Sequence, residues 1–361
     1  MNDPVNVFEF EPLARAKMER TAWDYVQGGS EDEVTLRANR SAFEKIFLRP
    51  RYLVDVRQRD LSTLVLGQPI SFPLLLAPTA YHRLAHPEGE LATARAAGAC
   101  GTIMILSTFA TTSLEDVMRV ATSPLWFQLY TYRDRQTTEW LIRRADAAGY
   151  RALVVTIDLP ILGRRERDLH NNFTLPEGME LSNLVGTGME QVPKPIDGSA
   201  LAAYDELLAE GLTWKDIDWM RSITSMPLVL KGVMTAEDAQ LAVEYGAAGI
   251  IVSNHGGRQL DGAPATIDVL PEIVDAVGGQ IEILLDSGVR RGTDVLKAIA
   301  LGAKAVLIGR PYVWGLAANG EAGVRRVLEL LREEFDTALA LVGKRSVAEI
   351  DASILFSKPH S

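Results

Sequence analysis

Eight short apolar runs, each followed by a segment with helical features, constrain the fold of this sequence more than any other feature. The runs comprise residues 74–77, 102–106, 125–129, 152–157, 228–230, 249–252, 281–285 and 305–308. Most of them are apolar at consecutive positions, as in parallel strands that helices cover on both faces. The alternation of strands and helices favours a parallel sheet. Eight units favour closure into an α/β fold of the (β/α)8 TIM-barrel type.

Three of the intervening segments begin with a helix-capping residue. Ser113, Thr213 and Thr235 each precede a segment with early acidic residues and apolar positions at helical spacing. A Ser or Thr side chain at this place accepts a hydrogen bond from the first turn, and early acids favour the positive end of the helix dipole. We therefore predict helices that begin directly after these residues, the third of them ending at Gly246.

A chain of 361 residues is long for one hydrophobic core, but a TIM barrel reaches this length as one unit. We expect a single domain with a helical lead-in and short β stretch over 1–72, the barrel over 73–318 and C-terminal helices over 319–361. An insertion at about 175–211 follows the fourth strand and is rich in Gly, Pro and acids. Because loops after barrel strands lie over the active face, we predict a mobile lid, with a plain variable insertion as the alternative.

The composition excludes several classes of protein. Apolar residues make up 47% of the chain and the net charge is −10, so we expect a globular protein that binds no nucleic acid. The single cysteine, Cys100, excludes an intrachain disulfide and a Cys-rich metal cluster and fits a reducing compartment. The sequence shows no secretory signal, no apolar stretch of about 18 residues and no peroxisomal tripeptide. We expect a cytoplasmic protein that does not bind a membrane.

Polar residues stand at the end of nearly every predicted strand, where packing of a core would not require them. In TIM barrels the reactive residues lie at the carboxyl ends of the strands. The residues at these ends are Pro78, Thr79, Ala80, Ser107, Gln128, Tyr130, Thr156, Asp158, Lys231, Ser253, Asn254, His255, Asp286, Ser287, Gly288, Gly309 and Arg310. They are the candidates for a site at the mouth of the barrel.

The last two strands are followed by the sequences DSGVRRG and IGRP. Barrels that bind phosphate use the loops after these two strands, near a helix N-terminus. Gly288 and Gly309 allow backbone N–H groups to approach an anion, and Arg290 and Arg310 add charged donors. The alternative is that the glycines form tight turns and the arginines are solvated.

The segment SNHGGRQLDG places His255 and Arg258 at the end of the sixth predicted strand. Asp158, at the end of the fourth, suits a partner that orients the imidazole and stabilises its charged form. Arg165 and Arg258 suit bidentate capture of a carboxylate. Lys231 ends an apolar strand, so its charge requires a partner, in a site or in a structural ion pair.

Together these motifs closely resemble the FMN-dependent 2-hydroxy-acid oxidases and dehydrogenases, of the glycolate oxidase and L-lactate oxidase type. The resemblance covers almost the whole chain, from WDYVQGG through FLRPRYLVDV, LLLAPTA, AHPEGELATARAA, WFQLYTYRDR, TIDLPILGRRERD and LVLKGV to VSNHGGRQLDG and LIGRP. The run SNHGGRQLDG is highly specific. The resemblance implies FMN as the cofactor and implies no metal.

It also implies a role for each candidate residue. The FMN ring would contact Pro78, Thr79, Ala80, Ser107, Gln128, Tyr130, Thr156, Lys231 and Ser253. The ribityl chain and phosphate would contact Asp286, Ser287, Gly288, Arg290, Gly309 and Arg310. Tyr25, Arg165 and Arg258 would hold the substrate carboxylate. Tyr130 would bond the substrate hydroxyl, His255 would take a proton, and Asp158 would stabilise the imidazolium.

The resemblance implies oxidation of a small (S)-2-hydroxy acid to the 2-keto acid, with O2 as acceptor and H2O2 as product. Ala80, Phe109 and Leu162 would shape the side-chain pocket, with room for L-lactate, which we favour, or glycolate. The alternatives are a soluble dehydrogenase with a quinone or other acceptor, an oxidase of larger acids such as mandelate, and a monooxygenase-like decarboxylation. The resemblance further implies a homo-oligomer, a tetramer or octamer.

The sequence disfavours two other classes of protein, and it differs from many relatives at Ser287. An IMP-dehydrogenase-like reaction would need a loop cysteine, and Cys100 precedes the second strand, at the wrong end of the barrel. A non-catalytic flavoprotein would be expected to lack part of the acid–base set. Many relatives have glycine at the position of Ser287. If the φ of Ser287 is negative, we expect the backbone contacts to be kept. If it is positive, we expect the serine to add strain and to weaken FMN binding.

Overall fold

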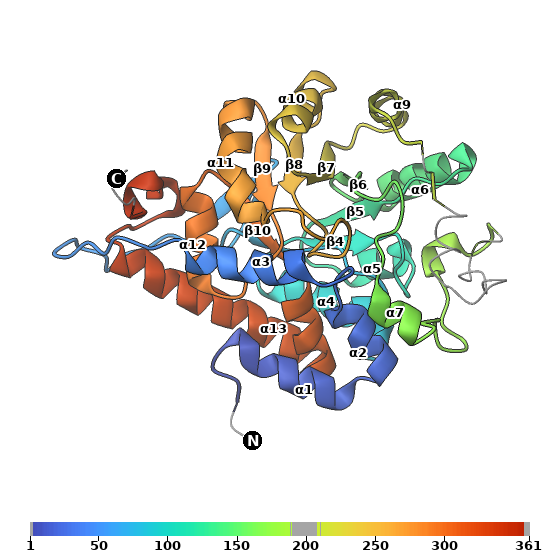
Figure 1. Ribbon diagram of the computed structural model, residues 1–361, viewed down its shortest axis with the longest axis horizontal. Coiled ribbons are helices and arrows are strands. Elements are labelled where there is room, and N and C mark those ends of the chain that lie inside the picture. Colours follow the sequence, from blue (N-terminus) through green and yellow to red (C-terminus); the bar gives the residue numbers. More distant parts are fainter. Residues whose placement is uncertain (1–2, 188, 190–207, 210, 357–361) are drawn as a thin grey trace.

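The computed structural model describes residues 3–187, 189, 208–209 and 211–356. Eight parallel strands close into a barrel in the order β10-β3-β4-β5-β6-β7-β8-β9, with helices around them (Figure 1). The strands are β3 (Leu74–Leu76), β4 (Met104–Ser107), β5 (Leu125–Leu129), β6 (Leu153–Thr156), β7 (Leu228–Val233), β8 (Gly249–Val252), β9 (Glu282–Leu285) and β10 (Ala305–Ile308). Each falls on one of the eight apolar runs, so the predicted (β/α)8 barrel is confirmed.

The strands are apolar at consecutive positions because their two faces pack against different layers. Leu75 belongs to a cluster inside the barrel, whereas Leu74 and Leu76 belong to the cluster between the strands and the helices. An antiparallel hairpin of β1 (Thr63–Val65) and β2 (Gln68–Ile70) adds two buried side chains to the interior cluster. The hairpin is the short β stretch expected before the barrel.

The helices that surround the barrel follow the strands in the expected alternation. They are α4 (Gly89–Ala99), α5 (Leu114–Val120), α6 (Arg135–Ala148), α7 (Glu166–His170), α9 (Trp214–Ile223), α10 (Ala236–Glu244), α11 (Thr266–Val277), α12 (Gly292–Ala300) and α13 (Arg310–Leu341). Ser113, Thr213 and Thr235 are the N-caps of α5, α9 and α10, and each accepts a backbone N–H or completes a capping box. The three predicted helix starts are therefore confirmed.

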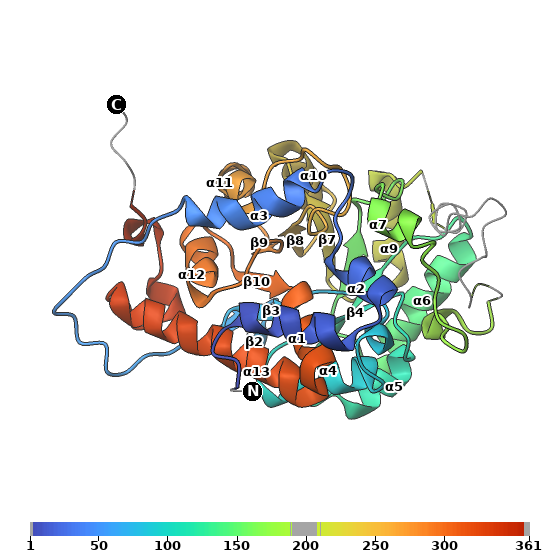
Figure 2. The same ribbon diagram turned by 60° about the horizontal axis from the view of Figure 1, so that its bottom comes forward.

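Helices at both ends of the chain pack against the barrel. The lead-in contains α1 (Phe10–Lys17), α2 (Arg20–Gln27) and α3 (Val34–Glu44), of which α1 packs along α13 and α3 against α11 (Figure 2). Helix α13 is kinked at Asn319 and Gly320, where the backbone leaves the helical region. The kink divides α13 into two parts, and the boundary at 319 between barrel and C-terminal helices stays a prediction.

Short 3-10 helices occupy several connections. They are η1 (Val7–Glu9), η2 (His82–Leu84), η3 (Ser182–Leu184), η4 (Val347–Glu349) and η5 (Ala352–Ile354). Of the insertion at about 175–211, residues 188, 190–207 and 210 lie outside the described residues, so the lid stays a prediction. In the part of the chain that the structure describes, no helix is long and apolar enough to cross a membrane.

Candidate active site

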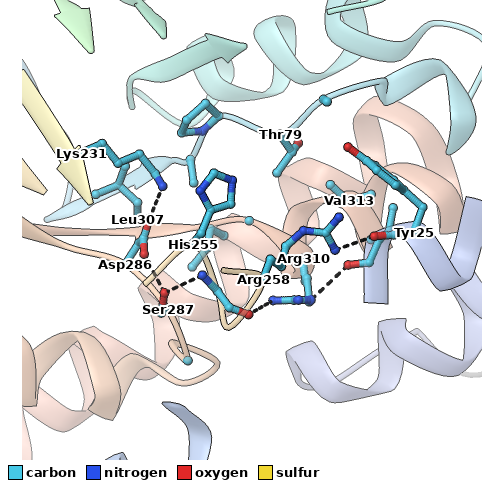
Figure 3. A pocket seen from close by; sticks show the side chains of 18 of the residues that line it. Tyr25, Thr79, Lys231, His255, Arg258, Asp286, Ser287, Leu307, Arg310 and Val313 are labelled. Atoms are coloured by element: carbon cyan, nitrogen blue, oxygen red, sulfur yellow. Dashed lines mark hydrogen bonds and ion pairs between the residues drawn. The ribbon is translucent and has the colours of Figure 1, made fainter. Parts of the chain in front are cut away.

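A cavity of about 1110 Å³, including the part open to solvent, lies at the carboxyl ends of the strands (Figure 3). The predicted site residues that line it are Tyr25, Pro78, Thr79, Ala80, Tyr130, Arg165, Lys231, His255, Arg258, Asp286, Ser287, Gly288, Arg290, Gly309 and Arg310. The apolar part of the wall includes Phe109 and Leu162, as expected, and Leu159 and Val313, which the sequence analysis did not identify. The structure thus brings fifteen of the twenty predicted residues around one space, whereas Ser107, Gln128, Thr156, Asp158 and Ser253 are not among the residues that line it.

Three predicted cofactor ligands form a hydrogen-bonded row across neighbouring strands. Ser107 of β4 pairs in register with Gln128 of β5, and its hydroxyl donates to Gln128 Oε1 over 3.2 Å. Gln128 Nε2 in turn donates to Thr156 Oγ1 of β6 over 3.0 Å. All three side chains are buried, and none is among the residues that line the cavity. Their contact with the cofactor therefore stays a prediction.

His255 and Asp158 form the titratable pair of the site. Nδ1 of His255 lies 3.0 Å from Oδ1 of Asp158. Burial alone would raise the pKa of Asp158, but the charges of His255 and Lys231 and the bond from His255 outweigh it and lower this pKa. Because the ionised carboxylate only accepts hydrogen bonds, Nδ1 carries the proton and Nε2 keeps a free lone pair.

The imidazole itself is held in its neutral form. Burial lowers the pKa of His255 below its ordinary value, and this effect outweighs the opposite effect of Asp158. Oδ2 of Asp158 is buried and has no hydrogen-bond partner among the described residues. The pair is therefore a neutral base beside a buried negative charge, which suits it to receive a proton and stabilise the cation that forms.

Two arginines beside this pair lack a carboxylate partner in the described part of the chain. Arg258 donates to the carbonyl oxygens of Tyr25 and Gly28, over 2.6 and 2.9 Å, and lies 4.9 Å from the centre of the Tyr25 ring. Arg165 is 8% exposed and approaches the Arg258 carbonyl. Burial, and then the charge of Arg165, lowers the pKa of Arg258. A bound carboxylate would neutralise this pair.

A second pair of cations in the wall of the cavity, Arg290 and Arg310, extends from the first, because Arg310 and Arg258 donate to the same carbonyl oxygen, that of Gly28. Arg310 donates only to backbone carbonyls, among them those of Val26 and Gly28, and Arg290 donates to the carbonyl of Val289. Neither has a carboxylate partner within the described ranges. Burial lowers the pKa of Arg310, and burial followed by the charge of a neighbouring arginine lowers that of Arg290 to about 10. Such cations favour an anionic ligand.

Backbone geometry beside Arg290 and Arg310 also suits a phosphate. Gly309 is the N-cap of α13, whose positive end therefore points at the cavity. Gly288 has a φ of +90°, and a Cβ there would lie 2.1 Å from the carbonyl oxygen of Asn39. Only glycine fits this position, and its backbone lines the cavity. The donors and charges present match those that the phosphate of FMN requires.

Lys231 reaches the cavity from β7 and has the partner that its burial requires. Its Nζ atom lies 3.0 Å from Ser253 Oγ and 3.5 Å from Asp286 Oδ2. The side chain of Lys231 is 5% exposed. The ion pair expected as an alternative is thus present, within the wall of the cavity itself.

A polar network beside Thr79 was not predicted from the sequence. Thr79 Oγ1 lies 2.6 Å from His82 Nε2 and also contacts the hydroxyl of Tyr312. Tyr312 donates to the carbonyl of Ala77 over 2.8 Å, and His82 Nδ1 lies 3.1 Å from Thr93 Oγ1. The network fixes the turn after β3. The only signal in the sequence was a His and a Tyr shortly after strand ends.

These features define a class of protein: a TIM barrel whose cavity brings together a histidine–aspartate pair, a buried lysine and a cluster of arginines beside a helix N-terminus. The family model described as FMN-dependent dehydrogenase matches residues 14–357, and the chain belongs to this family. The family assignment and the FMN cofactor inferred from the sequence motifs are thereby confirmed.

Individual relatives are similar over nearly their full length. The chain is 53% identical to an L-lactate oxidase of Nostoc sp. over 98% of this chain and 99% of the relative. It is 54% identical to glycolate oxidase 3 of Arabidopsis thaliana over 96% and 94% of the two chains. The crystal structure of mandelate oxidase with (S)-4-hydroxymandelic acid superposes with a TM-score of 0.91 at 44% identity, covering 98% of this chain and 99% of that chain.

Proposed function

We propose that this protein oxidises a small (S)-2-hydroxy acid to the 2-keto acid, with L-lactate favoured over glycolate and O2 as the acceptor that yields H2O2. One observation carries the proposal: the neutral base His255, paired with ionised Asp158, lines the same cavity as two arginines that have no carboxylate partner among the described residues. FMN, when bound, supplies the acceptor for the two electrons of the oxidation. The relatives named lactate and glycolate oxidases support the reaction class.

Different residues of the cavity bind the substrate carboxylate, accept the proton and orient the substrate hydroxyl. Arg165, Arg258 and Tyr25 hold the substrate carboxylate, which neutralises the two cations. His255 Nε2 accepts a proton from the substrate, and Asp158 stabilises the imidazolium. Burial raises the pKa of Tyr130, so this phenol stays protonated and acts as a donor. Its hydroxyl would bond the oxygen of the substrate hydroxyl and orient it toward the base.

The cofactor would be held at its phosphate and along its ring and ribityl chain. Arg290, Arg310, Gly288 and Gly309 would bind the phosphate. Lys231 would lie near the polar edge of the ring, where a fixed cation favours added negative charge. The remaining predicted ring and ribityl ligands are Pro78, Thr79, Ala80, Ser107, Gln128, Tyr130, Thr156, Ser253, Asp286 and Ser287.

The wall next to the base supports a small substrate. Ala80, Phe109 and Leu162 line the cavity there, and the Phe109 ring lies 4.8 Å from that of Tyr130, centre to centre. An oxidase of larger acids is the second candidate, because mandelate oxidase has nearly the same fold. A soluble dehydrogenase with a quinone acceptor carries out the same half-reaction and differs only in what reoxidises the cofactor.

An exposed apolar segment supports a homo-oligomer, a tetramer or octamer. Tyr52 and Leu53 are 75% and 107% exposed, in a segment that projects from the barrel before β1 (Figures 1 and 2). Exposed apolar patches of this kind mark interaction sites. Light scattering after size-exclusion chromatography would test the assembly. We also propose a cytoplasmic location, on the sequence grounds given above.

The first experiment is anaerobic mixing of the holoenzyme with L-lactate, followed by air, with flavin absorbance and peroxide as readouts. Bleaching followed by fast recolouring and stoichiometric peroxide is the expected result. Slow recolouring would favour the dehydrogenase. Bleaching by mandelate but not by lactate or glycolate would favour the oxidase of larger acids. No bleaching by any 2-hydroxy acid would overturn the proposal.

A further inference from the structure

Ser287 adopts a backbone conformation that a residue with a side chain rarely takes. Its φ is +75°, in the left-handed region that favours glycine. Its hydroxyl makes two hydrogen bonds: it donates to Oδ1 of Asp286 over 2.7 Å and accepts from the backbone N–H of Gly256 over 3.0 Å. A strained backbone persists where the surrounding contacts favour it, and here they come from the side chain that glycine would lack.

The Gly256 amide belongs to the turn that carries His255. His255, Gly256 and Gly257 have φ values of +57°, +66° and +74°, so three left-handed residues follow one another. Two amides of this turn donate to serine hydroxyls, His255 N–H to Ser253 Oγ over 3.1 Å and Gly256 N–H to Ser287 Oγ over 3.0 Å, while the Gly257 N–H donates to Asn254 Oδ1. The position of the imidazole therefore depends on two serines from different strand ends, Ser253 after β8 and Ser287 after β9.

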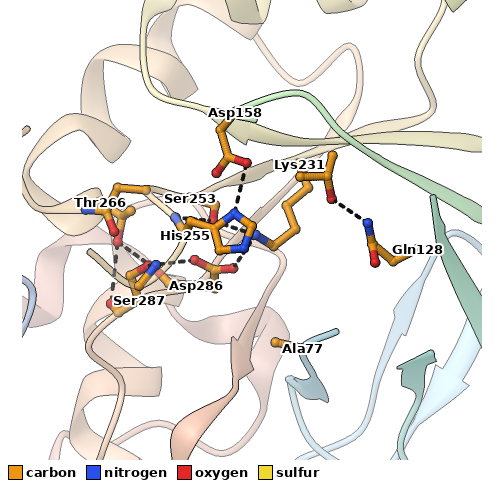
Figure 4. A network of polar contacts seen from close by, with 12 residues as sticks. Ala77, Gln128, Asp158, Lys231, Ser253, His255, Thr266, Asp286 and Ser287 are labelled. Atoms are coloured by element: carbon orange, nitrogen blue, oxygen red, sulfur yellow. Dashed lines mark hydrogen bonds and ion pairs between the residues drawn. The ribbon is translucent and has the colours of Figure 1, made fainter. Parts of the chain in front are cut away.

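Both serines are connected to Lys231. Lys231 Nζ donates directly to Ser253, and it forms an ion pair with Asp286, the acceptor of the Ser287 hydroxyl (Figure 4). The contacts close a ring of buried and half-buried polar groups beside the cavity. Within this ring, one oxygen of Asp286 accepts from Ser287 and the other faces Lys231. The Ser287 hydroxyl thus stabilises part of the negative charge of Asp286. Without this hydrogen bond, more of that charge would be compensated by Lys231.

We propose that Ser287 is a positioning residue whose hydroxyl couples the turn of the base His255 to the Lys231–Asp286 ion pair. The inference rests on the proposed function for the role of His255. The hydroxyl has two effects: it fixes the Gly256 amide, and it shares the charge of Asp286. Without it, the carboxylate is compensated by Lys231 alone, and the lysine then stabilises added charge on a bound flavin less well.

Two substitutions in the full-length holoenzyme separate the hydroxyl from the backbone strain. Ser287→Ala keeps a Cβ at positive φ and loses the hydroxyl, whereas Ser287→Gly loses both the hydroxyl and the strain. Ser62→Ala is the matched control, because Ser62 also donates to a neighbouring aspartate, over 2.7 Å, but lies on the exposed surface. The readouts are the flavin midpoint potential, the FMN dissociation constant, the melting temperature and the rate of flavin reduction.

We expect both Ser287 variants to give a more negative midpoint potential and to reduce the flavin about tenfold more slowly at saturating substrate. KM should change little, because the carboxylate site is untouched. Ser287→Gly should melt at or above the temperature of the wild type, and Ser62→Ala should match the wild type in potential and rate. The potential and the FMN dissociation constant require no substrate, so they test Ser287 even if no hydroxy acid is oxidised.

Three results would overturn the role of the hydroxyl. The first is a wild-type potential and rate in Ser287→Gly. The second is impairment of Ser287→Ala alone, which would assign the effect to the Cβ in a strained turn. The third is weakened FMN binding in both variants at an unchanged potential, which would make Ser287 a structural residue of the cofactor site.

Discussion

The Nδ1 atom of His255 lies 3.0 Å from Oδ1 of Asp158, and this contact determines which imidazole nitrogen is free to act as a base. We predict that His255→Ala keeps bound FMN and loses reduction by substrate, by a factor of at least about 10²–10⁴. Anaerobic stopped-flow measurement of flavin bleaching checks this prediction. The absorbance spectrum of the variant before mixing is the control for retained cofactor. Bleaching at the wild-type rate would remove His255 from the role of base.

The same contact predicts how the pH dependence responds to Asp158→Asn. The base acts when neutral, so activity is present above the pKa of His255 and is lost as pH falls through it. Burial lowers this pKa below its ordinary value of 6.5, which places the acid limb of kcat/KM below pH 6.5. Because the charge of Asp158 raises the pKa of His255, its loss should move the limb to still lower pH.

The rate itself should fall in Asp158→Asn, by about 10²–10⁴, because the imidazolium loses its buried counter-charge. The variant thus combines a lower rate with an acid limb at lower pH. The pH profiles of kcat/KM for the two enzymes, measured over the same buffers, give both quantities. An acid limb that moves upward would contradict the assignment of Asp158 as the partner that raises the pKa of His255.

Arg258 is proposed to bind the substrate carboxylate, and it also binds the lead-in segment. The variants Arg258→Met and Arg165→Met separate these two roles. Arg258→Met should raise KM and slow reduction, with a combined loss of about 2–5 kcal/mol of transition-state stabilisation. Because Arg258 also binds the carbonyls of Tyr25 and Gly28, part of the loss would reflect the lead-in segment. Arg165→Met removes the second cation without these bonds. If both variants keep wild-type kinetics, the arginine pair does not hold the substrate carboxylate.

The sequence was sufficient to predict the barrel and most of the residues that line the cavity, and the reason is physical. Strands covered on both faces must be apolar at consecutive positions, so eight such runs are visible without tertiary information. Their carboxyl ends converge in a barrel, which is why Asp158 and His255 could be paired although 97 residues separate them.

Contacts that depend on closure of the barrel or on local backbone angles could not be predicted. Tyr312 reaches Thr79 because β10 pairs with β3, and no local pattern indicates that contact. The φ of Ser287 is set by its surroundings, and only the structure shows it to be positive. The condition under which strain was predicted, a positive φ, is therefore met, while the effect of this strain on FMN binding stays a prediction.

If Arg290 binds the phosphate of FMN, as proposed, one substitution should have opposite effects on the stability of the apoprotein and on cofactor binding. Burial and the charge of Arg40 lower the pKa of Arg290, which means that the folded apoprotein carries this cation at a cost. Arg290→Met should therefore raise the melting temperature of the apoprotein. It should also weaken FMN binding by about 1.5–3 kcal/mol, about 10- to 150-fold, because a charge-assisted contact with the phosphate is lost.

Riboflavin, which lacks the phosphate, is the control ligand for this prediction. The dissociation constants of FMN and riboflavin, measured by flavin fluorescence for the wild type and for Arg290→Met, should differ between the two enzymes only for FMN. Equal weakening of both ligands would mean that Arg290 supports the ring or the fold and does not bind the phosphate. Unchanged FMN affinity with a lower melting temperature would show that the contact of Arg290 with the Trp314 ring, at 5.0 Å from its centre, is its main role.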